Sequence, residues 1–288
     1  MAISVRRAGL GRSIRVDKPM FLVQRTHVGS PLEVELLLGG GVLRSVVPSG
    51  AEVDGLLVAG SLPRVHSSLL GASLAYSSGA IVGAVSEFSG GCSSIIDAIH
   101  YLFCSAEPEK TYALVVVDSF LSSYKASSGG SSWADGAAAM RISPTGQINL
   151  TLRAYASSFD PEFLVMAHEI GGELQVPFFP RPLRNFEDVD VRTTRDLLHS
   201  ALDCAGLRVE DLNCVVLSNR SDSSLSRTER VFDGCARLFE SRKDYSHCGG
   251  ADILINLSLA FDDIGRGIYC LIGYGLGYSW RLMILEVD

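Results

Sequence analysis

The pattern of hydrophobic and polar positions in this chain occurs twice, in the same order, at an offset of roughly 155 residues. In each copy an acidic residue leads into an apolar strand that ends in small residues, a turn of small residues opens an apolar helix, and two further apolar segments follow. The paired segments are 52–60 with 211–219, 90–99 with 246–255, 112–117 with 268–273 and 135–142 with 278–285. An internal repeat of this kind indicates two copies of one α/β unit.

Two of the repeated segments predict strands that are buried on both faces. Residues 112–117 and 268–273 are almost continuously apolar, as in strands that helices cover on both sides. In the second copy, residues 191–205 predict a helix that carries its leucines on one face, and Gly206 follows at the position where glycine commonly ends a helix.

The corresponding helix of the first copy is hard to find. Residues 16–50 contain three prolines and three successive glycines, which leaves only residues 31–38 as a short helical candidate. We therefore expect an N-terminal half that is trimmed relative to its counterpart. The domain organisation that we predict is two duplicated α/β halves, residues 1–155 and 156–288, in one continuous fold.

Composition narrows the function classes. The chain has 288 residues, 47% of them hydrophobic and 20% charged, with a net charge of -7, so it can bury a sizeable core and lacks the concentrated basic surface that nucleic-acid binding needs. No apolar run approaches the roughly 20 residues that cross a bilayer, and no secretory signal pattern follows the basic N-terminal residues. We expect a cytoplasmic protein that binds neither membrane nor nucleic acid.

The cysteines do not form a metal or disulfide pattern. There are seven of them, an odd number, and no two are spaced as C-x-x-C, which favours reduced thiols over a disulfide framework or a zinc site. The segment 168–173 imitates a zinc-binding helix, but two glycines interrupt the turn that such a motif requires. We predict no metal and no bound cofactor.

Cys92 is the strongest candidate for chemistry. It follows Gly90 and Gly91 and stands at the start of a predicted apolar helix, where the positive end of the helix dipole favours a thiolate. A buried, inert cysteine is the alternative interpretation. The repeat nevertheless singles out this turn, and a nucleophile at a helix start fits covalent catalysis.

His247 stands in the corresponding turn of the second copy, so the relation between the copies predicts that it lies close to Cys92, as a base or ion-pair partner. A surface histidine is the competing interpretation. Ser218 and Asn219, at the end of another repeated strand, are possible lining residues, or else ordinary polar residues at a strand end. The backbone amides of Cys92 and of Leu276, in the glycine-rich segment 273–280, are candidate oxyanion donors.

These segments resemble the thiolase-fold condensing enzymes, and among them β-ketoacyl-acyl-carrier-protein synthase III. Residues 85–94 are similar to that family's nucleophile turn, 134–139 to its G-D-G-A-x-A run, 205–212 to its A-G-L…D-I-D segment and 273–280 to its G-x-G-G-G-x-T-W segment. The resemblance implies a five-layered αβαβα fold, pairing of subunits through the strand before the nucleophile helix, and acyl transfer from a carrier-protein or coenzyme A thioester to Cys92.

The chain departs from the family where the other two catalytic residues stand. The family has H-Q-A-N where this chain has residues 218–221, and G-N-T-S where it has 246–249. The expected N-terminal trimming also removes the stretch with which the family holds coenzyme A. Two hypotheses follow: an acyltransferase or atypical condensing enzyme of fatty-acid or specialised-metabolite biosynthesis, working as a homodimer, or a non-catalytic subunit that pairs with a complete ketosynthase.

Overall fold

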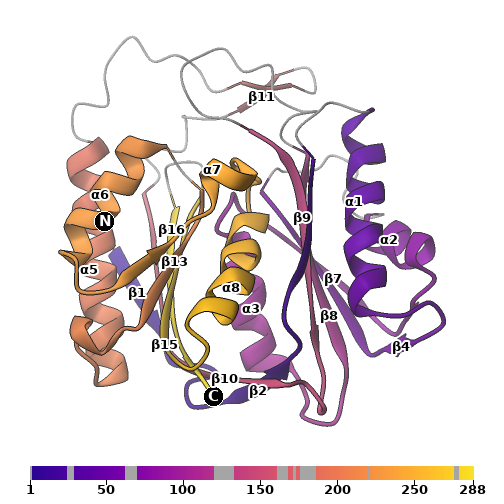
Figure 1. The fold of residues 1–288 in the computed structure, drawn as a ribbon, viewed down its shortest axis with the longest axis horizontal. Coiled ribbons are helices and arrows are strands. Elements are labelled where there is room, and N and C mark those ends of the chain that lie inside the picture. The colour runs from indigo at the N-terminus through magenta and orange to yellow at the C-terminus, as the bar shows by residue number, and fades with distance from the viewer. Residues whose placement is uncertain are drawn as a thin grey trace.

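The computed structural model describes residues 2–24, 29–61, 70–119, 133–160, 168–170, 173–175, 186–219, 221–275 and 279–288. These residues build five layers in the order helices, sheet, helices, sheet, helices (Figure 1). The helices are α1 (Pro31–Val46) and α2 (Leu70–Ser78) on one outer face, α3 (Ser94–Ser105) and α8 (Ala251–Asp263) in the centre, and α5 (Phe186–Ala205) and α6 (Asp222–Phe232) on the other outer face, with the short α7 (Arg242–Tyr245) before α8.

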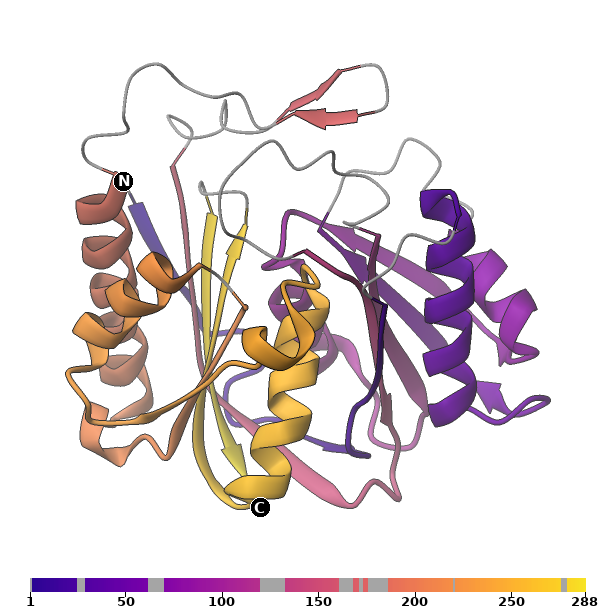
Figure 2. The same ribbon diagram turned by 45° about the horizontal axis from the view of Figure 1, so that its top comes forward.

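The two sheets lie on either side of α3 and α8 (Figure 2). The first contains β3 (Met20–Gln24), β9 (Asp135–Ile142), β8 (Tyr112–Ser119), β5 (Gly55–Gly60) and β7 (Val85–Ser89), and the second contains β1 (Ala2–Arg6), β10 (Ile148–Phe159), β16 (Ser279–Val287), β15 (Gly267–Gly275), β13 (Cys214–Leu217) and β14 (Arg237–Phe239). Strand β2 (Ser13–Val16) pairs with both β10 and β9 and so links the sheets. Two further pairs are small: β4 (Glu52–Val53) with β6 (Ile81–Val82), and β11 (His168–Ile170) with β12 (Glu173–Gln175).

The predicted duplication appears directly in the strand pairing. In the first half β5 runs parallel to β8, and β8 runs antiparallel to β9. In the second half β13 runs parallel to β15, and β15 runs antiparallel to β16. The predicted fold class, an α/β protein of five layers built from two similar halves, is confirmed. The division between residues 155 and 156 falls inside β10 and stays a prediction.

The helical candidate at residues 31–38 starts where predicted but is much longer, so the expected trimming of the N-terminal half is wrong at this helix. Helix α1 covers 16 residues and runs through all three glycines. Its start is fixed by a capping box between Ser30 and Glu33, and its glycines allow a close approach to neighbouring elements. A Cβ atom on Gly39 would stand 2.8 Å from a methyl group of Leu74 in α2, and one on Gly41 would stand 2.9 Å from Leu22 in β3. Packing between helices therefore outweighs the low helix propensity of glycine.

The central helices explain how the site is placed. Both α3 and α8 are apolar on almost every side because each packs between two sheets, and both begin at the edge where the parallel strands end (Figure 1). The turns before them thus meet at this edge. Helix α5 ends as predicted, with Gly206 following it at a φ of 67°. In the described part of the chain, no helix has the length and apolar character needed to cross a membrane.

Candidate active site

Cys92 lies in a tight turn between β7 and α3. Gly90 and Gly91 have φ values of 159° and 79°, so the turn uses a backbone conformation that favours glycine immediately before the cysteine. Cys92 is 7% exposed and lies two residues before the first residue of α3. Its sulfur therefore lies at the positive end of a helix dipole, where negative charge is stabilised.

The second half of the chain holds this turn in place. A Cβ atom on Gly275, at the end of β15, would stand 2.6 Å from the carbonyl oxygen of Gly90, and the hydroxyl groups of Ser93 and Ser279 lie 3.3 Å apart. Only glycine permits this approach of the strand to the turn. Strand β15 ends at Gly275, β16 begins at Ser279, and the two strands pair antiparallel.

His247 lies beside Cys92, as the repeat predicts. The Nε2 atom of His247 is 3.7 Å from the Sγ atom of Cys92, within hydrogen-bonding distance for sulfur. The indole ring of Trp133 packs against the imidazole at a centroid distance of 4.8 Å, and the amide of Ala134 donates a hydrogen bond of 3.0 Å to the carbonyl oxygen of His247. The histidine is therefore not a surface residue but a fixed neighbour of the thiol.

Asp252 completes a line of three side chains, and the sequence reasoning missed it. Its Oδ2 atom is 2.5 Å from Nδ1 of His247, on the far side of the ring from Cys92. The carboxylate also accepts hydrogen bonds of 2.8 Å from the amides of Cys248 and Asn219, and the residue is fully buried. A buried carboxylate with these partners is held in one position and orients the imidazole.

The charges of the three groups support one another. Burial alone lowers the pKa of His247, but the negative charge and hydrogen bond of Asp252, followed by the contact with Cys92, outweigh burial and raise the pKa of His247 to about 10. At neutral pH the ring is therefore an imidazolium that donates one hydrogen bond to Asp252 and faces the sulfur of Cys92 with the other. The ring is thus placed to stabilise negative charge that develops on the sulfur during a reaction.

The first half of the chain in turn holds the turn that carries His247. The amide of Gly250 donates to the Oδ2 atom of Asp118 at 2.7 Å and to the hydroxyl of Ser61 at 2.8 Å. Both acceptors are buried and lie at or just beyond the ends of β8 and β5. A Cβ atom on Gly136 would stand 2.5 Å from the Cβ atom of Cys248. Each half of the molecule thus positions the reactive turn of the other.

Asn219 does not line the site with a free side chain. Its Nδ2 atom donates to the carbonyl oxygen of Ser246 at 2.7 Å and to Ser241 at 3.3 Å. Its Oδ1 atom accepts from the amide of Ser241 and from Asn256, both at 2.9 Å. The side chain is thus committed to the loop that precedes His247.

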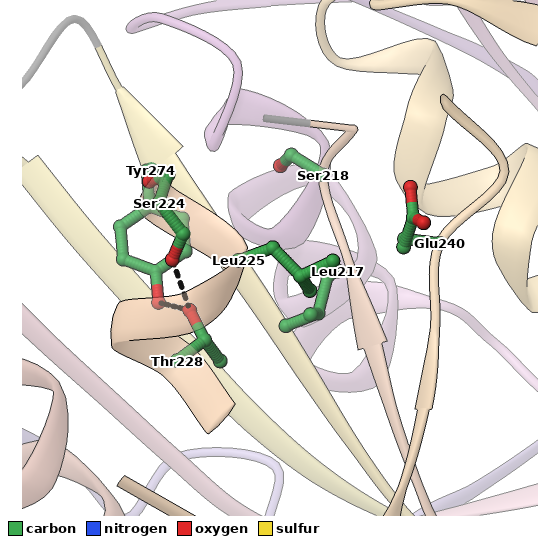
Figure 3. Close-up of a pocket in the computed structure, with 7 residues that line it drawn as sticks. All are labelled: Leu217, Ser218, Ser224, Leu225, Thr228, Glu240 and Tyr274. Carbon is green, nitrogen blue, oxygen red and sulfur yellow. Dashed lines mark hydrogen bonds between the residues drawn. The ribbon is translucent and has the colours of Figure 1, made fainter. Parts of the chain in front are cut away.

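Ser218 lies in a separate small cavity of about 10 Å³, room for one water molecule (Figure 3). Its neighbours there include Thr228 and Tyr274, whose hydroxyl groups are 3.3 Å apart. The hydroxyl of Ser218 is buried and has no hydrogen-bond partner within the described part of the protein. Neither the side chain of Ser218 nor that of Asn219 therefore joins the hydrogen-bonded line of Cys92, His247 and Asp252, although the backbone amide of Asn219 donates to Asp252.

The structure describes one of the two candidate oxyanion donors and not the other. Leu276 lies outside the described residues. The amide of Cys92 belongs to the turn before α3 and, among the described residues, has no hydrogen-bond partner in the protein. It remains a candidate donor to a carbonyl oxygen held against the sulfur. All seven cysteines are free thiols, and the described residues contain no cluster of His, Cys, Asp or Glu arranged to hold a metal.

Comparison with known proteins gives the fold. No protein-family model and no curated protein sequence matches the chain. Among solved structures it is similar to 3-oxoacyl-(acyl carrier protein) synthase III from Pseudomonas aeruginosa PAO1, with 17% identity over 96% of this chain and 98% of that one, at a TM-score of 0.70. It is also similar to the priming β-ketosynthase of the R1128 polyketide biosynthetic pathway, with 16% identity over 98% of both chains and a TM-score of 0.74.

A third similar structure is ChlB3, named an acyltransferase, with 15% identity over 96% of this chain and 98% of that one, at a TM-score of 0.71. These similarities extend over nearly the full length of the known structures. The protein therefore has the fold of the thiolase-type condensing enzymes and resembles synthase III, as the sequence motifs predicted.

Proposed function

We propose that the protein is an acyltransferase of the ketoacyl synthase III type, which takes an acyl group from a thioester onto Cys92 and passes it to an acceptor. The observation that carries the proposal is the alignment of Cys92, His247 and Asp252. A thiol, an imidazole that points at it and a buried carboxylate that orients the imidazole form the usual arrangement for covalent acyl transfer. The acyl donor that we infer is a carrier protein or coenzyme A.

The first half-reaction uses the ion pair. The thiolate of Cys92 attacks the carbonyl carbon of the thioester, and the bond between that carbon and the donor sulfur breaks. The imidazolium of His247 gives its Nε2 proton to the departing sulfur, so the donor leaves as a neutral thiol. Asp252 keeps the proton on Nδ1 in place throughout, which leaves Nε2 as the nitrogen that exchanges protons with the substrates.

The second half-reaction runs in the opposite sense. A hydroxyl, amine or thiol of the acceptor attacks the acyl carbon, His247 takes the acceptor's proton on Nε2, and Cys92 leaves as a thiolate. The ion pair is then restored without any added reactant. This cycle needs a single proton-transferring residue.

Decarboxylative condensation would need a further donor for the enolate oxygen, because oxyanions of this kind depend on preorganised hydrogen bonds. Asn219 does not provide one, since its amide group already has four partners. Ser218 lines a different cavity. We therefore favour transfer to a heteroatom over carbon–carbon bond formation.

A non-catalytic subunit that pairs with a complete ketosynthase is the alternative. It is favoured because, among the described residues, His247 is the one histidine that hydrogen-bonds to Cys92, and residues 218–221 carry no histidine where the similar family has one. In either case we propose that the subunits pair through β7, which is the edge strand of the first sheet and carries an exposed Val85. The three-residue line around Cys92 makes the catalytic function the better supported of the two.

The test is to incubate the purified protein with acyl thioesters, alone and with candidate ketosynthases, and to measure acyl adducts by intact mass. We expect an adduct on the isolated protein that Cys92→Ala abolishes and that Cys235→Ala, at an exposed cysteine, leaves unchanged. The absence of an adduct, together with stable association with a ketosynthase, would replace the catalytic proposal by the subunit alternative.

A further inference from the structure

The loop that carries His247 contains a strained residue. Ser246 has φ 66° and ψ -167°, a backbone conformation found almost only in glycine. Non-glycine residues keep such a conformation only where the surrounding structure imposes it. The strained residue directly precedes His247 in the chain, so its backbone angles set the direction in which the imidazole leaves the loop.

Two hydrogen bonds hold Ser246 in this conformation. Its amide donates to the carbonyl oxygen of Arg242 at 2.8 Å, and its carbonyl oxygen accepts from Nδ2 of Asn219 at 2.7 Å. The first bond continues the short helix α7. The second comes from a different element, the end of β13, and fixes the peptide plane between Ser246 and His247.

Asn219 is itself held rigidly. Its Oδ1 atom accepts from Asn256 in α8 and from the amide of Ser241, and the hydroxyl of Ser241 donates to Asn256 at 2.5 Å. Asn256 also donates to the carbonyl oxygen of Leu217 at 2.6 Å. All of these residues are at most 5% exposed. A buried, fully paired network of this kind has a single arrangement and can impose strain on a neighbour.

We infer that Asn219 is a positioning residue for His247, which it aims at Cys92 by holding Ser246 in a conformation that serine avoids. The inference rests on the proposed roles of Cys92 and His247. Without the hydrogen bond from Asn219, the backbone at Ser246 relaxes toward an ordinary conformation, and the peptide before His247 turns. The imidazole then loses the 3.7 Å approach to the sulfur.

The experiment measures alkylation of Cys92 by iodoacetamide at pH 7, followed by peptide mapping, because the rate reports the thiolate that the imidazolium stabilises and requires no acyl substrate. We expect Asn219→Ala to lower the rate between about tenfold and about a hundredfold, approaching His247→Ala, since displacements of about 1 Å have effects of this size. Asn149→Ala, at a distant asparagine paired with Asp288, is the matched control and is expected to react like the wild type.

A second substitution distinguishes a positioning role of Asn219 from a role in folding alone. Glycine adopts the conformation of Ser246 without strain, so Ser246→Gly added to Asn219→Ala is expected to recover part of the rate. If Asn219→Ala does not fold, Asn219→Asp takes its place: it keeps the oxygen that accepts from Ser241 and Asn256 and loses the donor to Ser246. Its added negative charge favours the imidazolium, so a slower reaction is then due to lost aim.

The outcomes are distinct. Alkylation at the wild-type rate in a folded Asn219 variant, with His247→Ala slow, would overturn the positioning role and leave the proposed function standing. The same holds if Ser246→Gly gives no recovery. If His247→Ala itself reacts like the wild type, the ion pair and with it the proposed function fail.

Discussion

Replacing Asp252 by asparagine tests the electrostatic design of the site. The side chain keeps its size, but one of its two acceptor oxygens becomes a donor. Asp252 accepts from His247, Cys248 and Asn219, so Asp252→Asn cannot satisfy all three, and its amide nitrogen faces either a backbone amide or the protonated Nδ1 of His247. We expect the pKa of His247 to fall steeply, because burial then acts without the carboxylate that opposes it.

The size of the effect follows from the raised pKa of His247. A rise from 6.5 to about 10 corresponds to about 5 kcal/mol in favour of the imidazolium, at about 1.4 kcal/mol for each pKa unit. If the whole of this preference acts on the transition state, losing it slows the acylation of Cys92 by about a thousandfold or more, and we expect a loss of at least about a hundredfold at pH 7.

The assay is quenched-flow acylation by a saturating acyl thioester, read by intact mass from pH 5 to 9. Asp97→Asn is the matched control, because Asp97 stands five residues after Cys92 as Asp252 stands five after His247, but it pairs with Arg281 at 3.0 Å. We also expect Asp252→Asn to slow acylation little further in a protein that already carries His247→Gln, since the two residues act as one unit. If Asp252→Asn is acylated within about threefold of the wild-type rate, Asp252 does not support the imidazolium during acylation.

Three further predictions concern stability. The raised pKa of His247 adds stability that is complete below about pH 6.5 and is lost as pH rises through about 10. In the wild type the free energy of unfolding should therefore fall over this pH range, and in His247→Gln it should fall less, as measured by urea titration. An equal fall in both proteins would contradict the ion pair. Arg227→Met removes the cation that faces the buried carboxylate of Asp190, which keeps its hydrogen bond from Trp280, and should cost about 3–5 kcal/mol in the same titration. Arg208→Met, at an exposed arginine, should cost about 0–1 kcal/mol, and equal costs would contradict the burial argument. Gly39→Ala should lower the melting temperature, because the added methyl group would meet Leu74, which is buried. Gly41→Ala should raise it, because the methyl group meets Leu22, which is partly exposed, and alanine favours the helix. The reverse order would contradict the packing of α1.

The sequence was sufficient to predict which segments of the two halves correspond and which two turns carry the site. The repeat predicted which strands correspond, and from the correspondence of two turns it predicted that His247 lies near Cys92. Both predictions follow from patterns that extend over many residues, and these patterns can be recognised although the sequence identity to known structures is only 10–17%. The turns meet because both central helices start at the same edge of the molecule.

Asp252 could not be singled out in the same way. Asp97 and Asp252 both stand in the first turn of corresponding apolar helices, so the sequence offers two candidate carboxylates and does not say which one faces a histidine. A carboxylate inside an apolar helix was nevertheless a usable signal, because such a group needs a partner. In the structure Asp97 pairs with Arg281 and Tyr155, and Asp252 pairs with His247.

The length of helix α1 and the role of Asn219 could not be predicted from the local sequence. The three glycines of α1 argue against a helix locally, and only the side chains of Leu74, Ser77 and Leu22 that pack over them explain why the chain is helical there. Asn219 was noticed as a polar residue at a strand end, but its four hydrogen bonds come from segments 22 to 37 residues further along the chain. Both outcomes depend on contacts between distant segments, which local propensity does not encode.

The most direct measurement is the fate of a single acyl group on Cys92. The protein is loaded with a limiting acyl thioester, freed of excess reagent, mixed with a thiol or amine acceptor, and followed by mass with peptide mapping. We expect one acyl group on Cys92 that passes to the acceptor, quickly in the wild type and slowly in His247→Gln. If the wild-type protein acquires no acyl group, or if Cys92→Ala acquires it equally, Cys92 is not the acyl carrier.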